Sequence, residues 1–138
     1  MADQYTPSQT LIKRYADVLV NFALNSGRGV QPNEVVECVV PDVAKALALE
    51  LQNSILRAGA QPIIRLLPTG FEKDFYTLAN EKQLTFFSTE YYRIKSQLID
   101  HQIGVIADVD PRELQFVDPS KMMTARNARK QYRDWLTD

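Results

Sequence analysis

The stretch EVVECVVPDVAKALALELQNSILRAGAQPIIRLL, residues 34–67, decides the fold of this chain. Two short apolar runs, Glu34–Val40 and Pro62–Leu67, are typical of parallel strands that are buried on both faces. Between them, Asp42 is a predicted helix cap and Gly59 a predicted helix end. Apolar residues recur between these limits at the spacing of one helical face, at Val43, Leu47, Leu51, Ile55 and Ala58. Two parallel strands need a crossover helix of this kind, so the stretch predicts a strand–helix–strand unit.

The segments around this unit carry further helical and strand patterns. A helix is predicted from Thr6-Pro7 to about Asn25, with an apolar face at Leu11, Tyr15, Val18, Leu19 and Phe22. Two helical pieces follow in residues 71–103, and we interpret the apolar run 85–88 between them as a linker. Their apolar faces contain Phe71, Phe75, Leu78 and Ala79 in the first piece and Tyr91, Ile94, Leu98 and Ile99 in the second.

The last part of the chain predicts one more strand and one more helix. The run IGVIADV, residues 103–109, is typical of a third buried strand. Asp118-Pro119 then marks the start of a tail helix, residues 119–138, with Met122, Ala125, Ala128, Tyr132 and Trp135 on its apolar face. We therefore expect a small three-layer α/β domain with a parallel sheet of at least three strands flanked by helices. Residues 1–138 are expected to form a single domain.

Charge, apolar run length and cysteine count argue against several classes of function. The 138 residues carry a formal net charge of −1, so no overall field attracts nucleic acid. No apolar run approaches the roughly 20 residues that span a bilayer. We expect a cytoplasmic protein with no nucleic-acid or membrane partner. Cys38 is the single cysteine, which excludes an intrachain disulfide, and its place in a strand favours a buried, inert thiol.

Catalytic motifs are missing from the sequence. A metal centre needs several histidines and carboxylates, but His101 is the single histidine, and a structural role at a helix end is favoured for it. The sequence also lacks the G-x-S-x-G nucleophile elbow and both common glycine-rich phosphate loops. We expect no catalytic, cofactor-binding or metal-binding residue in this chain.

Two groups of polar residues remain as candidates. Asp108 and Asp110 follow the third predicted strand, at the edge where open α/β sheets bind ligands, although turn formation and helix capping are the favoured roles. The loop Thr69-Gly70 follows the second strand at the same edge. The tail helix carries a basic stripe, for which a solvated face is favoured over a phosphate or partner surface. The stripe contains Arg126, Arg129, Lys130 and Arg133.

Four segments, read in order, resemble a known family. These are LIKRYADVLVNFAL (11–24), the NEVV strand, ALALELQNSILRAGA (46–60) and IADVDPRELQFVDPSK (106–121). Their order and spacing are similar to the N-terminal domain of the aminopeptidase T / aminopeptidase S (PepS) family of metallo-aminopeptidases, from about Leu11 to about Arg133.

This resemblance implies a parent enzyme about three times as long, which removes N-terminal residues from peptides. It also implies that a C-terminal domain supplies two divalent metal ions (zinc, cobalt, manganese or magnesium), their ligands and the homodimer contacts. The tail helix would lead toward that domain. We interpret the chain as a non-catalytic N-terminal domain that forms one wall of the peptide cleft and is inactive by itself.

Two other classes stay open. A stand-alone small-molecule binding module would use the strand ends near Thr69-Gly70 and Asp108–Asp110. An interaction or assembly domain would instead expose an apolar patch, for which Tyr132 and Trp135 are the candidates.

Overall fold

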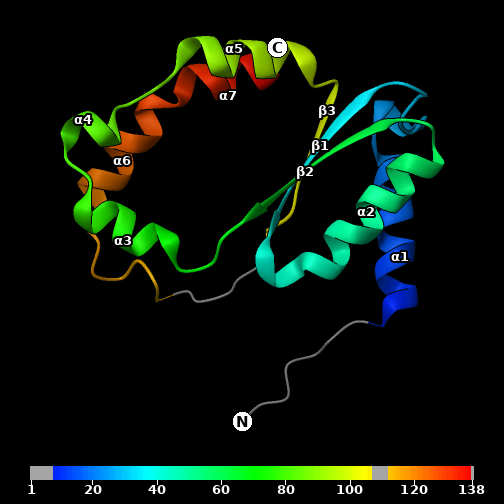
Figure 1. Ribbon diagram of the computed structural model, residues 1–138, viewed down its shortest axis with the longest axis horizontal. Coiled ribbons are helices and arrows are strands. Elements are labelled where there is room, and N and C mark those ends of the chain that lie inside the picture. The colour runs from blue at the N-terminus through cyan, green and yellow to red at the C-terminus, as the bar shows by residue number, and fades with distance from the viewer. Residues whose placement is uncertain (1–7, 107–111, 138) are drawn as a thin grey trace. The chain divides into compact units, whose positions relative to one another are not determined.

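The computed structural model describes residues 8–106 and 112–137, which form two compact units (Figure 1). The sheet unit comprises the described residues of Met1–Leu67 and Ile99–Ala107. The helical unit comprises the described residues of Pro68–Leu98 and Asp108–Asp138. Each unit is considered by itself below.

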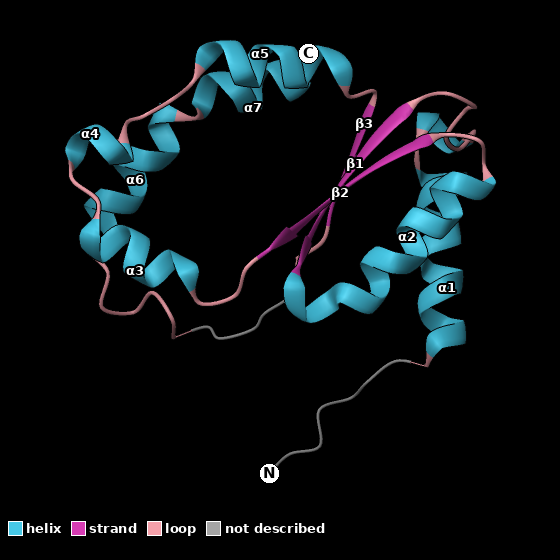
Figure 2. Cartoon of the chain, viewed as in Figure 1, coloured by secondary structure: helices cyan, strands magenta, loops and turns pink. Residues whose placement is uncertain are grey.

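Among its described residues, the sheet unit contains three parallel strands in the order β2-β1-β3 (Figure 2). Their bounds are β1 Val35–Pro41, β2 Gln61–Leu67 and β3 His101–Gly104. In this register Cys38 of β1 lies opposite Ile64 of β2 and Ile103 of β3. The predicted α/β class with a three-stranded parallel sheet is confirmed.

Burial differs between the two strands that the sequence predicts to be buried on both faces. In β1 the side chains of Val36, Cys38 and Val40 are fully buried. In β2, by contrast, Ile63 and Leu67 remain more than one-third exposed. The prediction was therefore wrong for β2, because this strand pairs with β1 alone among the described residues and lies at a sheet edge.

The crossover between β1 and β2 is helix α2, Lys45–Arg57, preceded by a 3-10 turn at Asp42–Ala44. Leu51 and Ile55 are fully buried, as the helical spacing predicts. Gly59 follows the helix with φ +80°, the left-handed conformation that a helix end favours. The predicted cap was wrong: Asp42 lies inside the 3-10 turn, and the capping position of α2 is Ala44, which has no side-chain oxygen.

Helix α1, Gln9–Val18, continues as a π-helical turn over Leu19–Ala23 and packs beside α2. Ser54 of α2 is buried and donates a hydrogen bond from Oγ to Oδ1 of Asp17 at 2.8 Å. Ala16 of α1 and Val20 of the π-helical turn enter the core, and both are fully buried.

The apolar face predicted for the first helix is present, but most of it does not face the core. Four of its five members are about half exposed or more, and only Leu19 packs partly against the core. The four exposed members are Leu11, Tyr15, Val18 and Phe22. Helix α1 thus has two apolar faces, since the small residue Ala16 lets its backbone approach α2 on one side while the larger side chains point away.

The described residues of the helical unit form five helices. Their bounds are α3 Phe71–Leu78, α4 Glu81–Leu84, α5 Thr89–Leu98, α6 Pro119–Ala128 and α7 Lys130–Thr137. Within this unit α4 contacts α6 and α5 contacts α7. The linker predicted at 85–88 is confirmed as a segment without strand structure.

Three predicted elements differ in their bounds. The first helical piece of residues 71–103 breaks at Ala79, because Asn80 and Gln83 form a capping box that starts α4. The tail is two helices rather than one, with Arg129 as a non-helical residue between them. The third strand begins at His101, two residues earlier than predicted, and ends at Gly104. The predicted strand residues 107–109 lie outside the described part of the chain.

The helical unit has a small interior. Among its described residues, the buried hydrophobic ones are Ala79, Leu84 and Ala125, with Tyr76 packed against them. A second cluster joins α5 and α7 through aromatic rings, with Tyr92 4.6 Å from Tyr132 between ring centroids. Asp118 begins α6 as predicted, since Oδ1 accepts a hydrogen bond from the Ser120 N–H at 2.9 Å.

Candidate functional site

The loop after β2 leads directly into helix α3. Gly70 has φ +87° and lies immediately before Phe71, so the chain turns into the helix without a longer connection. The first turn of α3 carries Glu72 and Asp74, whose negative charges favour the helix N-terminus. The predicted loop Thr69-Gly70 therefore leads into an acidic helix start.

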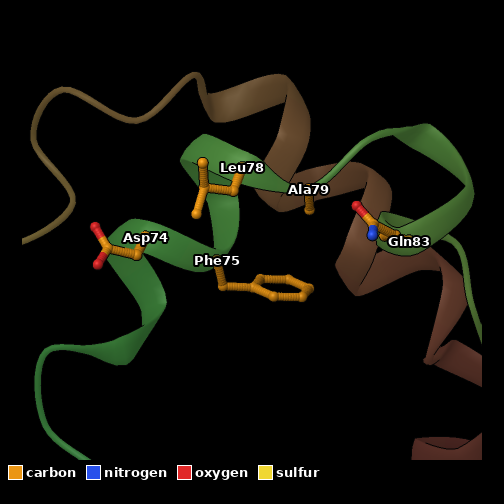
Figure 3. Close-up of a pocket in the computed structure, with 5 residues that line it drawn as sticks. All are labelled: Asp74, Phe75, Leu78, Ala79 and Gln83. Carbon is orange, nitrogen blue, oxygen red and sulfur yellow. The ribbon is translucent and has the colours of Figure 1, made fainter.

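A pocket of about 350 Å³ lies along α3 and the start of α4. It is lined by Asp74, Phe75, Leu78, Ala79 and Gln83. Figure 3 shows the Phe75 ring extending below Ala79 toward the helix that carries Gln83. The Asp74 carboxylate lies at the opposite end of the pocket.

Contacts inside the helical unit hold the helices that line the pocket in place. The Phe75 and Tyr76 rings meet edge to face, with centroids 5.4 Å apart. Lys121 of α6 donates from Nζ to the Tyr76 carbonyl oxygen at 2.9 Å. Asn80 Oδ1 accepts from the Gln83 N–H, and the Gln83 side chain accepts from the Asn80 N–H, each at 2.9 Å. These bonds hold the two helices that line the pocket at a defined angle.

The chemistry of this pocket suits binding rather than bond breaking. Three of its five lining residues are apolar, and the polar ones are a single carboxylate and a single amide. Such a lining can hold an apolar side chain with a cationic or amide group beside it. It contains no nucleophile paired with a base and no set of metal ligands.

Sequence reasoning missed Asp74 and Gln83 as pocket residues. A signal for the bend between α3 and α4 was present, since Asn80 followed three residues later by Gln83 is a capping-box pattern. That pattern places a helix boundary at Ala79 and brings Gln83 back toward α3. The depth of the pocket depends on side-chain packing, which no sequence pattern encodes.

His101 has a structural role in the sheet unit. Its Nε2 lies 2.9 Å from Oε2 of Glu34, and both side chains are mostly buried. Oε1 of Glu34 accepts from Asn25 Nδ2 at 2.9 Å and from the Gln31 N–H at 2.6 Å. Burial raises the pKa of Glu34, but these hydrogen bonds outweigh it and hold the pKa below its ordinary value.

Two neighbours of His101 also hold β3 against β1. Asp100 Oδ2 accepts from the Val35 N–H at 2.7 Å, and Gln102 Nε2 donates to Oε1 of Glu37 at 2.7 Å. Glu37 is 1% exposed in the middle of β1. Three successive side chains therefore fasten this four-residue strand, and His101 is occupied by one of these bonds.

Cys38 is buried in the centre of the sheet. Burial, together with the negative charge of Glu37, raises the pKa of its thiol to about 12. The reactive thiolate is therefore scarce at neutral pH, as expected for an inert packing residue.

The remaining candidates divide into three cases. Asp108 and Asp110 lie outside the described residues. The basic stripe of the tail is exposed, and part of it is engaged locally, since Lys130 Nζ lies 2.7 Å from Oδ2 of Asp134. Tyr132 and Trp135 do not form an exposed patch as expected for an interaction domain, because their rings pack toward α5 and Phe87.

The donor set of the described residues does not fit a catalytic metal centre. Its single histidine is bonded to Glu34, and nowhere in residues 8–106 and 112–137 do three or more His, Cys, Asp or Glu side chains gather as a metal would require. None of the described helices combines the length and the apolar composition that crossing a bilayer requires.

The described elements define an α/β domain with a parallel sheet, together with a helical unit that carries the pocket. A family model described as thermophilic metalloprotease (M29) matches residues 8–138, and the chain belongs to this family. The resemblance to aminopeptidase T-type N-terminal domains is thereby confirmed.

A comparison with solved structures shows a similar fold. The chain is similar to the structure described as wild-type AmpT from Thermus thermophilus, with a TM-score of 0.76 and 17% identity. The match covers 94% of this chain and 32% of that one, so the chain spans about one-third of the matched protein. No curated protein sequence shows significant similarity to the chain.

Proposed function

We propose that this chain is the N-terminal, non-catalytic domain of a metal-dependent aminopeptidase that removes N-terminal residues from peptides. The family match over residues 8–138 supports the peptidase assignment, and the donor set supports the non-catalytic role. The two divalent metal ions, their ligands and the homodimer contacts then belong to another part of the enzyme.

Within that enzyme the domain acts as one wall of the peptide cleft. A wall contributes by positioning the substrate and excluding water rather than by supplying reacting groups. The pocket on α3 and α4 supports this role, because Phe75 and Leu78 offer an apolar surface for a peptide side chain. The Asp74 carboxylate beside them favours a peptide with a positive group next to that side chain.

The first test concerns catalysis by the chain itself. After dialysis, elemental analysis should find no stoichiometric zinc, cobalt, manganese or magnesium, and the chain should not hydrolyse leucyl peptides when these ions are added. Tightly bound metal at one ion per chain, or aminopeptidase activity, would show that the non-catalytic assignment is wrong.

The second test concerns the pocket. A leucine–lysine dipeptide amide should shift the amide resonances of α3 and α4 in a saturable manner. Asp74→Asn and Leu78→Ser should each weaken binding by about tenfold, the effect of roughly 1.4 kcal/mol. Glu72→Gln and Phe86→Ser are the matched controls, because both residues are exposed and neither lines the pocket. Equal effects of all four changes would contradict a role of the pocket.

The third test uses a complete enzyme of the family. Removing the region equivalent to this chain should leave metal content largely intact but change KM or the tolerated peptide length. A folded, metal-loaded truncate with unchanged KM and kcat for short and long peptides would replace the wall role with one in folding or assembly.

The same proposal includes a cytoplasmic location without nucleic-acid or membrane partners. The near-zero net charge and the single cysteine support it. An interaction or assembly domain is the second candidate function, and the exposed apolar face of α1 favours it.

A further inference from the structure

The segment between the π-helical turn and β1 has a backbone that favours glycine at most of its positions. Four of the five residues 25–29 have positive φ, namely Asn25 (54°), Ser26 (55°), Gly27 (92°) and Gly29 (79°). The two that are not glycine adopt this left-handed conformation at an energetic cost, and such residues persist only where surrounding contacts hold them. The geometry of the segment therefore depends on the groups to which it is bonded.

One oxygen of the Glu34 carboxylate holds this segment, which together with its next two residues is called the turn 25–31 below. Oε1 accepts from Asn25 Nδ2 at 2.9 Å and from the Gln31 N–H at 2.6 Å. Asn25 Nδ2 also donates to the Gly29 carbonyl oxygen at 2.8 Å, and Gln31 Nε2 donates to the same oxygen at 3.2 Å. These bonds form a closed ring, so a change at the carboxylate reaches both ends of the turn.

The other oxygen of the same carboxylate holds β3. Oε2 lies 2.9 Å from Nε2 of His101, and the Glu34 and His101 side chains are 24% and 15% exposed. The pKa of Glu34 lies below its ordinary value, and an ionised carboxylate only accepts hydrogen bonds, so Nε2 is the donor at neutral pH. The two residues are 67 positions apart, so this one group joins distant parts of the chain.

Strand β3 depends strongly on bonds of this kind. It has four residues and, within the described part of the chain, pairs with β1 alone. A strand this short has few backbone bonds of its own, so side-chain bonds provide much of its protection from local opening. It follows α5 after only Ile99 and Asp100, which makes it the place where the chain returns from the helical unit to the sheet unit.

We propose that Glu34 couples the turn 25–31 to β3, so that each stabilises the other through the single carboxylate. The bond from His101 to Oε2 restricts the torsions of the Glu34 side chain and thereby keeps Oε1 in place for Asn25 and Gln31. The formed turn in the same way keeps Oε2 in place for His101. Hydrogen bonds that share one partly buried group strengthen one another. A disturbance of β3 is therefore transmitted to the turn, and a disturbance of the turn to β3.

Two other side-chain bonds of the β3 segment allow this coupling to be separated from a general loosening of the sheet edge. Asp100 accepts from the Val35 N–H, and Gln102 donates to Glu37. Neither of these bonds involves Glu34. Removing one of them should loosen β3 while the carboxylate keeps all of its own partners.

Amide hydrogen exchange of the 138-residue chain, followed by NMR, tests the proposal. The Arg28 and Gly29 amides report on the turn, since they bond to the Asn25 and Leu24 carbonyl groups. His101→Leu removes the donor and should speed up their exchange by about tenfold, the effect of losing a bond to a charged group. His101→Gln should change it by less than about twofold, because a glutamine Nε2 can still donate to the carboxylate.

Two further variants locate the coupling in Glu34. The Val105 amide, which bonds to the Val39 carbonyl group, reports on the end of β3. Gln102→Ala is the matched control, and it should speed up exchange at Val105 but change the turn amides by less than about twofold. In a Glu34→Ala background, His101→Leu should no longer affect the turn, because the connecting group is gone. Circular dichroism checks that each variant is folded.

The reverse direction has its own variant. Asn25→Gly removes a donor to Glu34, while glycine keeps the positive φ without cost. Because coupling is reciprocal, exchange at Val105 should rise by a factor similar to that at the turn in His101→Leu. An unchanged rate at Val105 would contradict the coupling.

Three results from the other variants would also overturn the proposal. They are turn amides that His101→Leu leaves unchanged, an equal effect of His101→Leu with and without Glu34, and an equal effect of Gln102→Ala on the turn. The last result would mean that the turn follows any opening of the sheet edge, without a special role of the carboxylate.

Discussion

The sheet unit and the helical unit bury their apolar residues in different ways. In the sheet unit, β1 and α2 place five side chains at zero exposure in one continuous core, namely Val36, Cys38, Val40, Leu51 and Ile55. In the helical unit, the enclosed interior consists of Ala79, Leu84 and Ala125, while Leu78 is 80% exposed. The comparison indicates that the sheet unit carries most of the stability and that the helical unit offers surface for binding.

The largest expected effect comes from truncating matched leucines in the two units. Leu51→Ala should lower the free energy of unfolding by about 2–5 kcal/mol, because it leaves a cavity in a closed core. Leu78→Ala should cost less than about 0.5 kcal/mol, because water already surrounds that side chain. Urea unfolding followed by circular dichroism measures both, and equal losses would contradict the comparison.

One glycine in each unit gives a second comparison of how tightly the two units are packed. Gly29 and Gly70 both have positive φ, but a Cβ at Gly29 would overlap the Asn21 carbonyl group, whereas a Cβ at Gly70 meets nothing within 4 Å. Gly70→Ala should cost about 1–2 kcal/mol from the left-handed backbone alone. Gly29→Ala should cost more, about 3 kcal/mol, because the π-helical turn must also shift. Thermal melts of the two variants compare them directly.

A smaller effect concerns the carboxylate that holds β3. Glu34→Gln should lower stability at pH 7 by about 1–2 kcal/mol, the range for hydrogen bonds to charged groups. The pKa of Glu34 is lower in the folded chain than its ordinary value of 4.5, so its contribution is present above that pH. It is lost as the pH falls through the folded pKa. The difference between Glu34→Gln and the original chain should therefore shrink as the pH falls below 4.5 toward the folded pKa, and a difference that stays constant as the carboxylate is protonated would argue against this assignment.

The smallest effect is a local one in the helical unit. Asn80→Ala removes the capping box of α4 and should cost about 1 kcal/mol. Hydrogen exchange should speed up at the Gln83 and Leu84 amides, which bond to Asn80, while the amides of α2 keep their rates. Uniformly faster exchange in both units would mean that they unfold together.

The difference in burial between the two units also explains which features could be predicted from the sequence. The strand–helix–strand order of the crossover unit was predictable because its strands are short apolar runs and Pro41 and Gly59 mark the ends of its first strand and its helix. The burial of β2 and the cap of α2 were not. The apolar faces of Phe71, Phe75 and Leu78 and of Tyr91, Ile94 and Leu98 were also recognised as stripes. In the structure these side chains are exposed, because periodicity identifies a stripe but not whether another element covers it.

The candidate site was less predictable than the fold. The inert role of Cys38 followed from its strand position, but the loop Thr69-Gly70, which topology suggested as a ligand site, does not line the pocket. The pocket itself depends on the bend at Ala79 and on the position of α6 behind Tyr76, which lies 45 residues from Lys121 in the sequence. Contacts at such separations arise from tertiary packing, so a single sequence contains no direct signal for them.

The fastening of β3 has a consequence for how the chain acquires its structure during synthesis. The segment that supplies β3 belongs to the sheet unit, but residues 68–98 before it belong to the helical unit. During translation β1, α2 and β2 are therefore synthesised first, and the sheet can be completed only after a further stretch of helical sequence. At about 5–20 residues per second this leaves one edge of β1 without its neighbour for several seconds. During that interval the backbone groups of Val35 and Val39, which later bond to Asp100 and Val105, are open to other chains. A nascent polypeptide stalled before residue 99 should accordingly be the form that chaperones retain.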